Sequence, residues 1–353
     1  MSAKVLEKTS TDDLDVKKTR FEENKGFLYA VISALCYTVS LSSLRGLTNY
    51  PDVSSDWSIA VKELSTVFCV APVILVQYCR GKFRFPTWKV LFLITFAGVA
   101  CQLVGARNHL IAYAALGLAL ATPLIQAVQL IVTSLFGALW LKERVTKSRL
   151  CALVLLIVAV WLLSGGNVSL DATIAGKPIR IGLGLFCVFL TALGYATQLS
   201  VTRKLLGAPK TTPEDEARSG RANEYLPTSL NMVAITGVGA VICGACLTFE
   251  RGPAAWLAPP APCWGFVLTA GVANMIGFYF QTESLRRLFV LKQTMVANAQ
   301  TITLTLAGLL FFHEKFTWTI AVGAILVAVG VAVAGMEHDN KSVAGTESDS
   351  GCA

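Results

Sequence analysis

Apolar residues form ten long runs along this 353-residue chain, and short polar segments separate the runs. Each run approaches the length of about 20 residues that an α-helix needs to cross a bilayer. The runs are too long for barrel strands, and few of them alternate, so helices are the form that satisfies the backbone in lipid. The pattern predicts an all-α membrane protein with ten transmembrane helices, at residues 27–47, 57–79, 88–112, 115–140, 147–164, 181–204, 227–249, 263–286, 289–312 and 317–335.

One hydrophobic unit occurs twice in the chain. Residues 143–146 read Glu-Arg-Val-Thr, and residues 314–317, which lie 171 positions later, read Glu-Lys-Phe-Thr. An earlier echo relates residues 33–37 to residues 191–195. Each unit holds five predicted helices, an odd number, so the second copy enters the membrane inverted relative to the first. Inverted repeats are typical of secondary transporters, whose substrate sites lie near the midplane between the halves.

These features divide the chain into two repeats and two tails. The first repeat covers residues 26–165 and the second covers residues 181–336. Residues 1–25 are densely charged and are predicted to be a polar tail without regular structure, and residues 337–353 are predicted to be disordered. Most lysines and arginines fall in loops on the side of the N-terminal tail, which predicts a multi-pass protein of the cell membrane with both termini in the cytoplasm.

Charge and motifs argue against several other classes of protein. The net charge of +8 is spread over loops instead of one patch, which disfavours a nucleic-acid partner. No Gly-x-x-x-x-Gly-Lys-Ser/Thr sequence occurs, so the expected transport is secondary. Two of the three histidines, His313 and His338, fall at or beyond predicted membrane boundaries, and Cys243 and Cys246 form a lone pair in an apolar run. We therefore expect neither metal, nor cofactor, nor enzymatic activity.

Polar residues at helical spacing predict which helix faces surround a cavity, because polar groups within a membrane point to the bundle interior or to water. Alternatives remain: hydroxyl and amide stripes also serve hydrogen bonding between helices, Lys62 can snorkel to the nearby surface, and Arg107 can anchor at the interface. The predicted substrate-binding residues are Tyr37, Lys62, Arg107, Gln126, Tyr195, Gln198, Asn274, Gln281 and Asn298.

Two carboxylates lie within the apolar runs and are candidates for carrying a coupling proton, Glu63 and Glu283. For Glu283 the alternative is an ion pair with Arg286 or Arg287, its neighbours along the helix. The last run carries a stripe of alanines, and small residues in this pattern can pack against a second protomer. A homodimer is therefore one possible assembly.

The chain resembles the drug/metabolite transporter superfamily, in the form with two EamA-type units. The resemblance rests on the inverted five-plus-five repeat and on the Glu-basic-x-Thr junctions at residues 143–146 and 314–317, each followed by a Gly/Ala-rich closing run. It implies a central cavity between the repeats and transport of a small organic metabolite by alternating access. Export of amino acids or related metabolites is the specific hypothesis. An antiporter for sugars, nucleotide sugars or phosphorylated metabolites is the alternative, and a non-transporting membrane scaffold or receptor is the rival from another class.

Overall fold

The computed structural model describes residues 2–50, 52–81, 85–140, 181–206, 227–288, 290–297 and 299–312, with short pieces at 154–155, 173–174, 177–178 and at a few positions from 318 to 329. This part of the chain is helical apart from two-residue strands β1 (Thr173–Ile174) and β2 (Lys177–Pro178), which pair antiparallel. Within it, six helices are long and apolar enough to cross a membrane. The predicted class, a helical multi-pass membrane protein, is confirmed.

Eight of the ten predicted runs coincide with described helices. The runs at 147–164 and 317–335 and both Glu-basic-x-Thr junctions lie outside these residues or almost wholly so, and the ten-helix inverted repeat stays a prediction. The helices are α1 (Ser2–Leu47), α2 (Ser55–Cys79), α3 (Trp88–Val99), the π-helical η1 (Ala100–Ala106), α4 (Arg107–Leu116), α5 (Leu118–Leu139), α7 (Ile181–Leu206), α9 (Thr228–Arg251), the 3₁₀ turn η2 (Pro253–Trp256), α10 (Ala261–Arg287), α11 (Val290–Ala297) and α12 (Ala299–Phe311).

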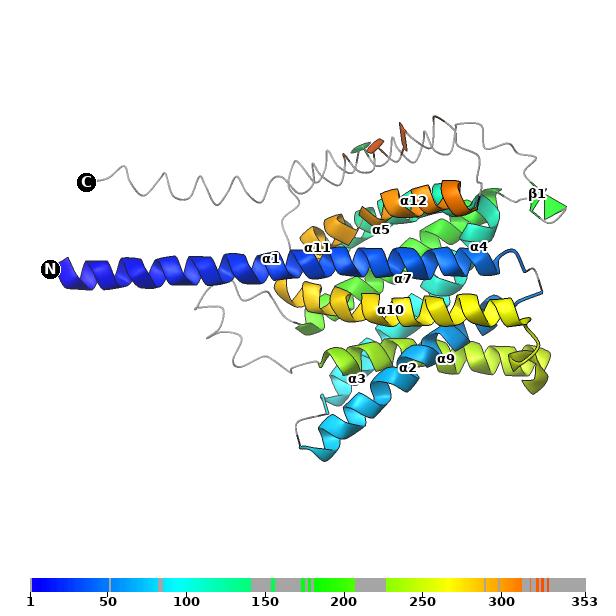
Figure 1. The fold of residues 1–353 in the computed structure, drawn as a ribbon, viewed down its shortest axis with the longest axis horizontal. Coiled ribbons are helices and arrows are strands. Elements are labelled where there is room, and N and C mark those ends of the chain that lie inside the picture. The colour runs from blue at the N-terminus through cyan, green and yellow to red at the C-terminus, as the bar shows by residue number, and fades with distance from the viewer. Residues whose placement is uncertain are drawn as a thin grey trace.

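The N-terminal tail corrects one expectation. The charge of residues 1–25 predicts a tail without regular structure, but α1 begins at Ser2 and runs without a break into its apolar segment (Figure 1). The tail is rich in Lys and Glu, which favour helix even when exposed to water. Extending a helix that the apolar segment has already nucleated costs little, because nucleation is the unfavourable step.

Glycine ends two of the helices, α4 and α9. Gly117 separates α4 from α5 with a φ of 76°, and Gly252 ends α9 with a φ of 77°. A residue with a side chain rarely adopts this backbone conformation, whereas glycine adopts it freely. These two positions therefore let the chain reverse at the ends of its spans.

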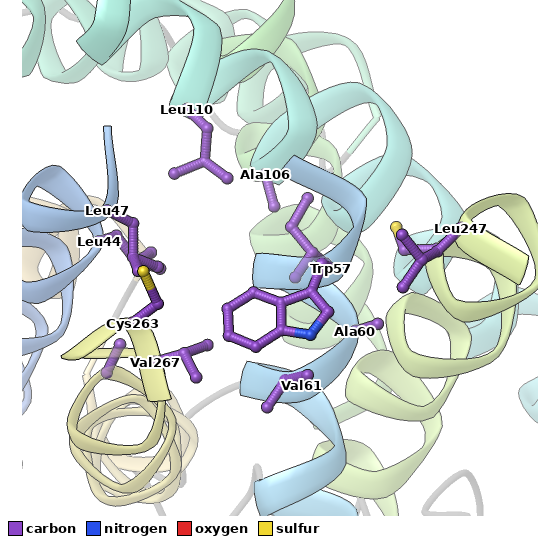
Figure 2. Close-up of a cluster of buried hydrophobic side chains, with 13 residues drawn as sticks. Leu44, Leu47, Trp57, Ala60, Val61, Ala106, Leu110, Leu247, Cys263 and Val267 are labelled. Atoms are coloured by element: carbon purple, nitrogen blue, oxygen red, sulfur yellow. The ribbon is translucent and has the colours of Figure 1, made fainter. Parts of the chain in front are cut away.

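The helices pack in pairs that lie far apart in sequence: α1 runs along α10, α2 packs on α9, and α5 packs on α7 (Figure 1). Trp57, 1% exposed, is central to a core at the end of the bundle where α1 ends and α2 begins (Figure 2). Its indole nitrogen donates to the carbonyl of Trp256, with a donor–acceptor distance of 3.0 Å, and its ring meets Trp264 edge-on. This apolar core joins α1, α2, α9 and α10 at one end.

Candidate functional site

A cavity lies within the bundle and takes side chains from α1, α2, η1, α4, α5, α7, α9, α10, α11 and α12. Its empty volume is about 1150 Å³, which includes space open to solvent. Eight predicted site residues line this cavity: Tyr37, Lys62, Glu63, Gln126, Tyr195, Gln198, Asn274 and Gln281.

Amide side chains dominate the polar lining. Each offers an acceptor oxygen and a donor nitrogen, so the set suits a ligand with both kinds of group on its edges. Besides the four predicted amides, Gln102, Gln129, Gln293 and Gln300 also line the cavity. Gln293 and Gln300 are seven residues apart within the predicted run 289–312, a spacing that places them on one face of a continuous helix, although the structure divides them between α11 and α12.

Several of these amide atoms have no partner within the described part of the chain: the side-chain oxygens of Gln102 and Gln300, and both the oxygen and the nitrogen of Gln293. Leaving a buried polar group unsatisfied costs about 1–3 kcal/mol. Unpaired amides facing a cavity therefore indicate that a ligand or water completes their hydrogen bonding.

Tyr37 is held at the cavity by the contact between α1 and α10. Its hydroxyl donates to the side-chain oxygen of Gln281, 2.9 Å away. One turn earlier on both helices, the Ser33 hydroxyl donates to the carbonyl of Gly277 at 2.8 Å. The tyrosine ring and the amide are therefore positioned together by one helix crossing.

Tyr195 has an equivalent setting where α7 crosses η1 and α4. Its hydroxyl lies 2.9 Å from the Nδ1 atom of His109. The Thr191 hydroxyl donates to the carbonyl of Cys187 at 2.7 Å and lies 3.4 Å from the carbonyl of Gly105. As with Tyr37, a tyrosine contacts a polar side chain while a hydroxyl one turn earlier contacts a glycine carbonyl. His109 lines the cavity but is not among the predicted site residues, because its sequence position suggests the outer end of a helix.

Lys62 and Glu63 form a buried ion pair in the cavity wall. The Nζ atom lies 2.7 Å from Oε1, and the side chains are 8% and 1% exposed. Lys62 therefore does not snorkel to the surface. The two residues are sequence neighbours on α2, so the pair connects no two helices.

Arg107 corrects another expectation, since it does not line the cavity. Its guanidinium lies 3.0 Å from the carboxylate of Asp56, near the start of α2, and its side chain is 39% exposed. The Asp56 carboxylate therefore pairs with the positive charge of Arg107, which had suggested a contact with the substrate. Asn298 lies outside the described residues.

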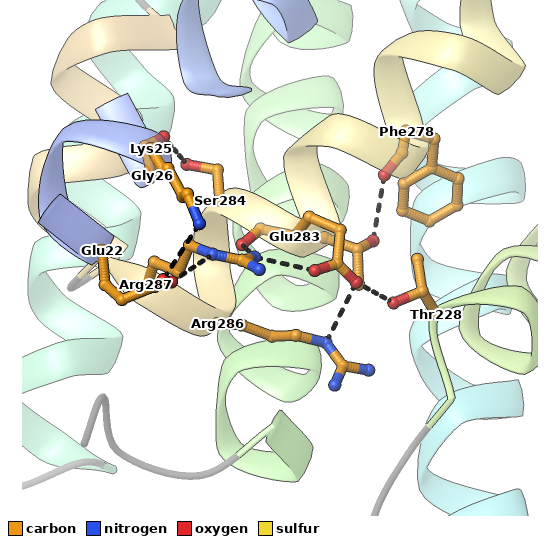
Figure 3. A network of polar contacts seen from close by, with 10 residues as sticks. Glu22, Lys25, Gly26, Thr228, Phe278, Glu283, Ser284, Arg286 and Arg287 are labelled. Carbon is orange, nitrogen blue, oxygen red and sulfur yellow. Dashed lines mark hydrogen bonds and ion pairs between the residues drawn. The ribbon is translucent and has the colours of Figure 1, made fainter. Parts of the chain in front are cut away.

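Glu283 lies away from the cavity lining, in a network at the end of α10 that we call the Glu283 cluster (Figure 3). Arg287 approaches it to 2.7 Å and Arg286 to 3.4 Å, and the Thr228 hydroxyl donates to it at 2.5 Å. Glu283 therefore forms the ion pairs with Arg286 and Arg287 that are the alternative to proton coupling. The cluster connects α10 to α9, and through Glu22, 3.2 Å from Arg287, to α1.

Glu22 is held in its charged form by this cluster. Partial burial acts to raise the pKa of Glu22, but its hydrogen bonds and charge interactions with Lys25 and Arg287 outweigh burial and lower that pKa below its ordinary value. The contact with Arg287 is therefore present at neutral pH.

We expect Arg287→Ala to lower the free energy of unfolding by about 1–3 kcal/mol, because it removes charge-assisted hydrogen bonds to Glu22 and Glu283. Thermal unfolding of the detergent-solubilised protein measures the effect. Arg80→Ala is the matched control, since Arg80 is exposed at the end of α2. Equal losses in the two variants would show that the cluster contributes nothing to stability.

Comparisons with known proteins agree with this architecture. The EamA-like transporter family model matches residues 219–336, and the model for purine nucleobase transmembrane transport matches residues 77–244. No curated protein sequence matches the chain. One solved crystal structure superposes with a TM-score of 0.59 at 16% identity, covering 88% of this chain and 96% of that chain, which shows a shared fold.

The two family matches support the resemblance of the chain to drug/metabolite transporters, and they indicate a membrane transporter of small metabolites.

Proposed function

We propose that this transporter carries a small, uncharged, planar nitrogen heterocycle of the purine nucleobase class. The observation that carries the proposal is the cavity lining, where eight amide side chains surround aromatic rings. The rings are those of Tyr37, Tyr113, Tyr195 and Phe278. The match of residues 77–244 to the purine nucleobase transport model supports the same class of substrate.

The chemistry of such a ligand complements the lining at its edges and its faces. Purine edges alternate hydrogen-bond donors and acceptors, and Asn or Gln pairs with them through two hydrogen bonds at once. Their flat faces stack on aromatic side chains, which contributes about 1–3 kcal/mol per base. Lys62 and Glu63 neutralise each other, so the lining offers no surplus of positive charge. A phosphorylated substrate or a nucleotide sugar fits this wall less well than an uncharged one.

Movement of the ligand follows from alternating access, in which one half of the bundle rocks against the other around the cavity. The similar settings of Tyr37, which lies on α1 and contacts α10, and of Tyr195, which lies on α7 and contacts α4, support this mechanism. Each predicted half contributes one of the two tyrosines to the same cavity. When the cavity opens toward one side of the membrane, the geometry of the two helix crossings changes. The amide side chains remain in contact with the ligand.

A second candidate is export of amino acids, and the Lys62–Glu63 pair favours it. An ammonium and a carboxylate side by side match the two charges of a zwitterion, whose carboxylate and ammonium would replace the partners within the pair. The amide-rich wall remains unexplained by this candidate, which is why we rank it second.

Counterflow in proteoliposomes tests the proposal. Vesicles preloaded with unlabelled adenine should take up labelled adenine, and an equal load of alanine should not support this uptake. Gln126→Leu should reduce adenine exchange about tenfold, as expected for the loss of one two-point contact. Gln77→Leu is the matched control, since Gln77 lies on α2 outside the lining. Exchange of labelled alanine without exchange of adenine would establish the second candidate, and exchange of neither would refute both.

A further inference from the structure

The burial of Lys62 and Glu63 is not explained by the fold. Two other ion pairs connect elements: Arg107–Asp56 joins α4 to α2, and Arg287–Glu22 joins α10 to α1. The Lys62–Glu63 pair joins neighbours on one helix. Charges within a membrane are costly and are retained mainly where they function. This pair holds no two helices together, and it lies in the cavity wall. We therefore attribute the energetic cost of burying it to a role in transport.

Glu63 has one free position. Its Oε1 atom contacts Lys62, whereas its Oε2 atom is buried without a partner in the described part of the chain. A proton bound to Oε2 would displace no hydrogen bond at that oxygen, but it would neutralise the carboxylate that Lys62 pairs with.

The surroundings of the pair include α10, where Gly271 packs against the Lys62 carbonyl. The nearest ionisable residues along that helix, Cys263 and Tyr279, are each roughly 12 Å from Gly271 at 1.5 Å per residue, and Glu283 is roughly 18 Å away. The ionisable groups that interact with the pair are Tyr37 of α1, Cys101 of η1, His109 of α4, Tyr195 of α7 and Cys243 of α9.

We propose that Glu63 is the coupling site of this transporter, where one proton binds and is carried together with the substrate. The ion is a proton and not a metal cation, because the Lys62 ammonium already occupies the cation position, 2.7 Å from the carboxylate. The proposal rests on the proposed function, since the substrate completes the cycle.

Lys62 connects the proton to the substrate. When Glu63 takes a proton from water on one side, Lys62 loses its counter-ion and its ammonium needs another acceptor. A ring nitrogen or carbonyl oxygen of the heterocycle supplies one, so the protonated carrier binds the substrate more tightly. After the cavity opens to the other side, the substrate leaves, Lys62 pairs with Glu63 again, and the proton returns to water. The coupling is reciprocal, so each of the two ligands favours binding of the other.

Proteoliposomes with an imposed pH difference test the coupling. One pH unit, acidic outside, should drive accumulation of adenine to about tenfold above its external concentration, as one proton per substrate allows. A sodium gradient at equal pH should drive none. Adenine binding should also tighten at least about fivefold as the pH is lowered, in the range usual for coupled ligands.

Glu63→Gln is the central variant, because the amide keeps the shape of a protonated carboxyl. We expect slower adenine counterflow, no accumulation on a pH gradient, and no pH dependence of binding. Glu250→Gln is the control, since it makes the same chemical change at an exposed position of α9 outside the cavity lining, and it should still accumulate adenine. Glu63→Asp, which keeps an ionisable group, should retain gradient-driven uptake at a lower rate.

Three results would overturn the coupling while leaving the proposed function intact: wild-type counterflow without gradient-driven uptake, accumulation driven by sodium, or accumulation by Glu63→Gln equal to wild type. Absence of adenine counterflow in the wild type would instead refute the proposed function. If Glu63→Gln does not fold, the sodium and pH arms on the wild type and the Glu63→Asp variant still decide the question.

Discussion

Lys62→Met is expected to lose about 3–5 kcal/mol of stability and to abolish transport. The substitution leaves the Glu63 carboxylate 1% exposed and without its counter-charge. Removing one partner of a buried pair carries this cost because the remaining charge keeps its desolvation penalty. The thermal unfolding midpoint of the solubilised protein measures stability, and adenine counterflow measures transport.

The double variant Lys62→Met with Glu63→Met separates stability from function. Replacing both members of a buried pair by apolar residues of similar volume is often neutral or stabilising. The pair connects no two helices, so the double variant should melt close to the wild type while still failing to transport. A double variant less stable than Lys62→Met would show that the pair has a structural task. Transport by the double variant would remove the pair from the mechanism.

Gly194→Ala is expected to prevent correct assembly of the bundle. A Cβ atom at Gly194 would lie 2.5 Å from the backbone nitrogen of Gly105 and closer still to the carbonyl oxygen of Ala100. Backbone atoms at a helix crossing cannot turn aside as a side chain can, so α7 and η1 would have to separate. Such overpacking costs about 1–3 kcal/mol or more, and here it also moves Tyr195 away from His109.

Gly182→Ala is the matched control. Gly182 lies on the same helix, and among the described residues no heavy atom comes within 4 Å of the point where its Cβ atom would sit. Alanine is the better helix former, so this variant should fold normally. Size-exclusion chromatography of the solubilised proteins compares the yield of monodisperse material. Equal yields for Gly194→Ala and Gly182→Ala would mean that the close crossing is not required.

The hydrophobic pattern determined the class of the protein and the place of eight of its helices. A helix that crosses a bilayer must be long and apolar, so the positions of such helices follow from the order of apolar and polar residues. Helical periodicity also identified Tyr37, Gln198 and Gln281 as residues of an inward face, because residues four and seven positions apart share a face whatever the fold.

Only the tertiary structure decided which of those polar residues meet in one cavity and which find partners elsewhere. Lys62 and Arg107 are both basic residues in apolar runs, yet Lys62 lines the cavity and Arg107 pairs with Asp56 near the start of α2. Glu63 likewise lies in the cavity wall, whereas Glu283 lies in the Glu283 cluster. The physical reason is that the surroundings of a side chain are formed by helices that are distant in sequence. Asp56, opposite Arg107, lies on another helix, and the cavity around Lys62 and Glu63 is assembled from helices along the whole described chain, so the pattern along one helix cannot contain either.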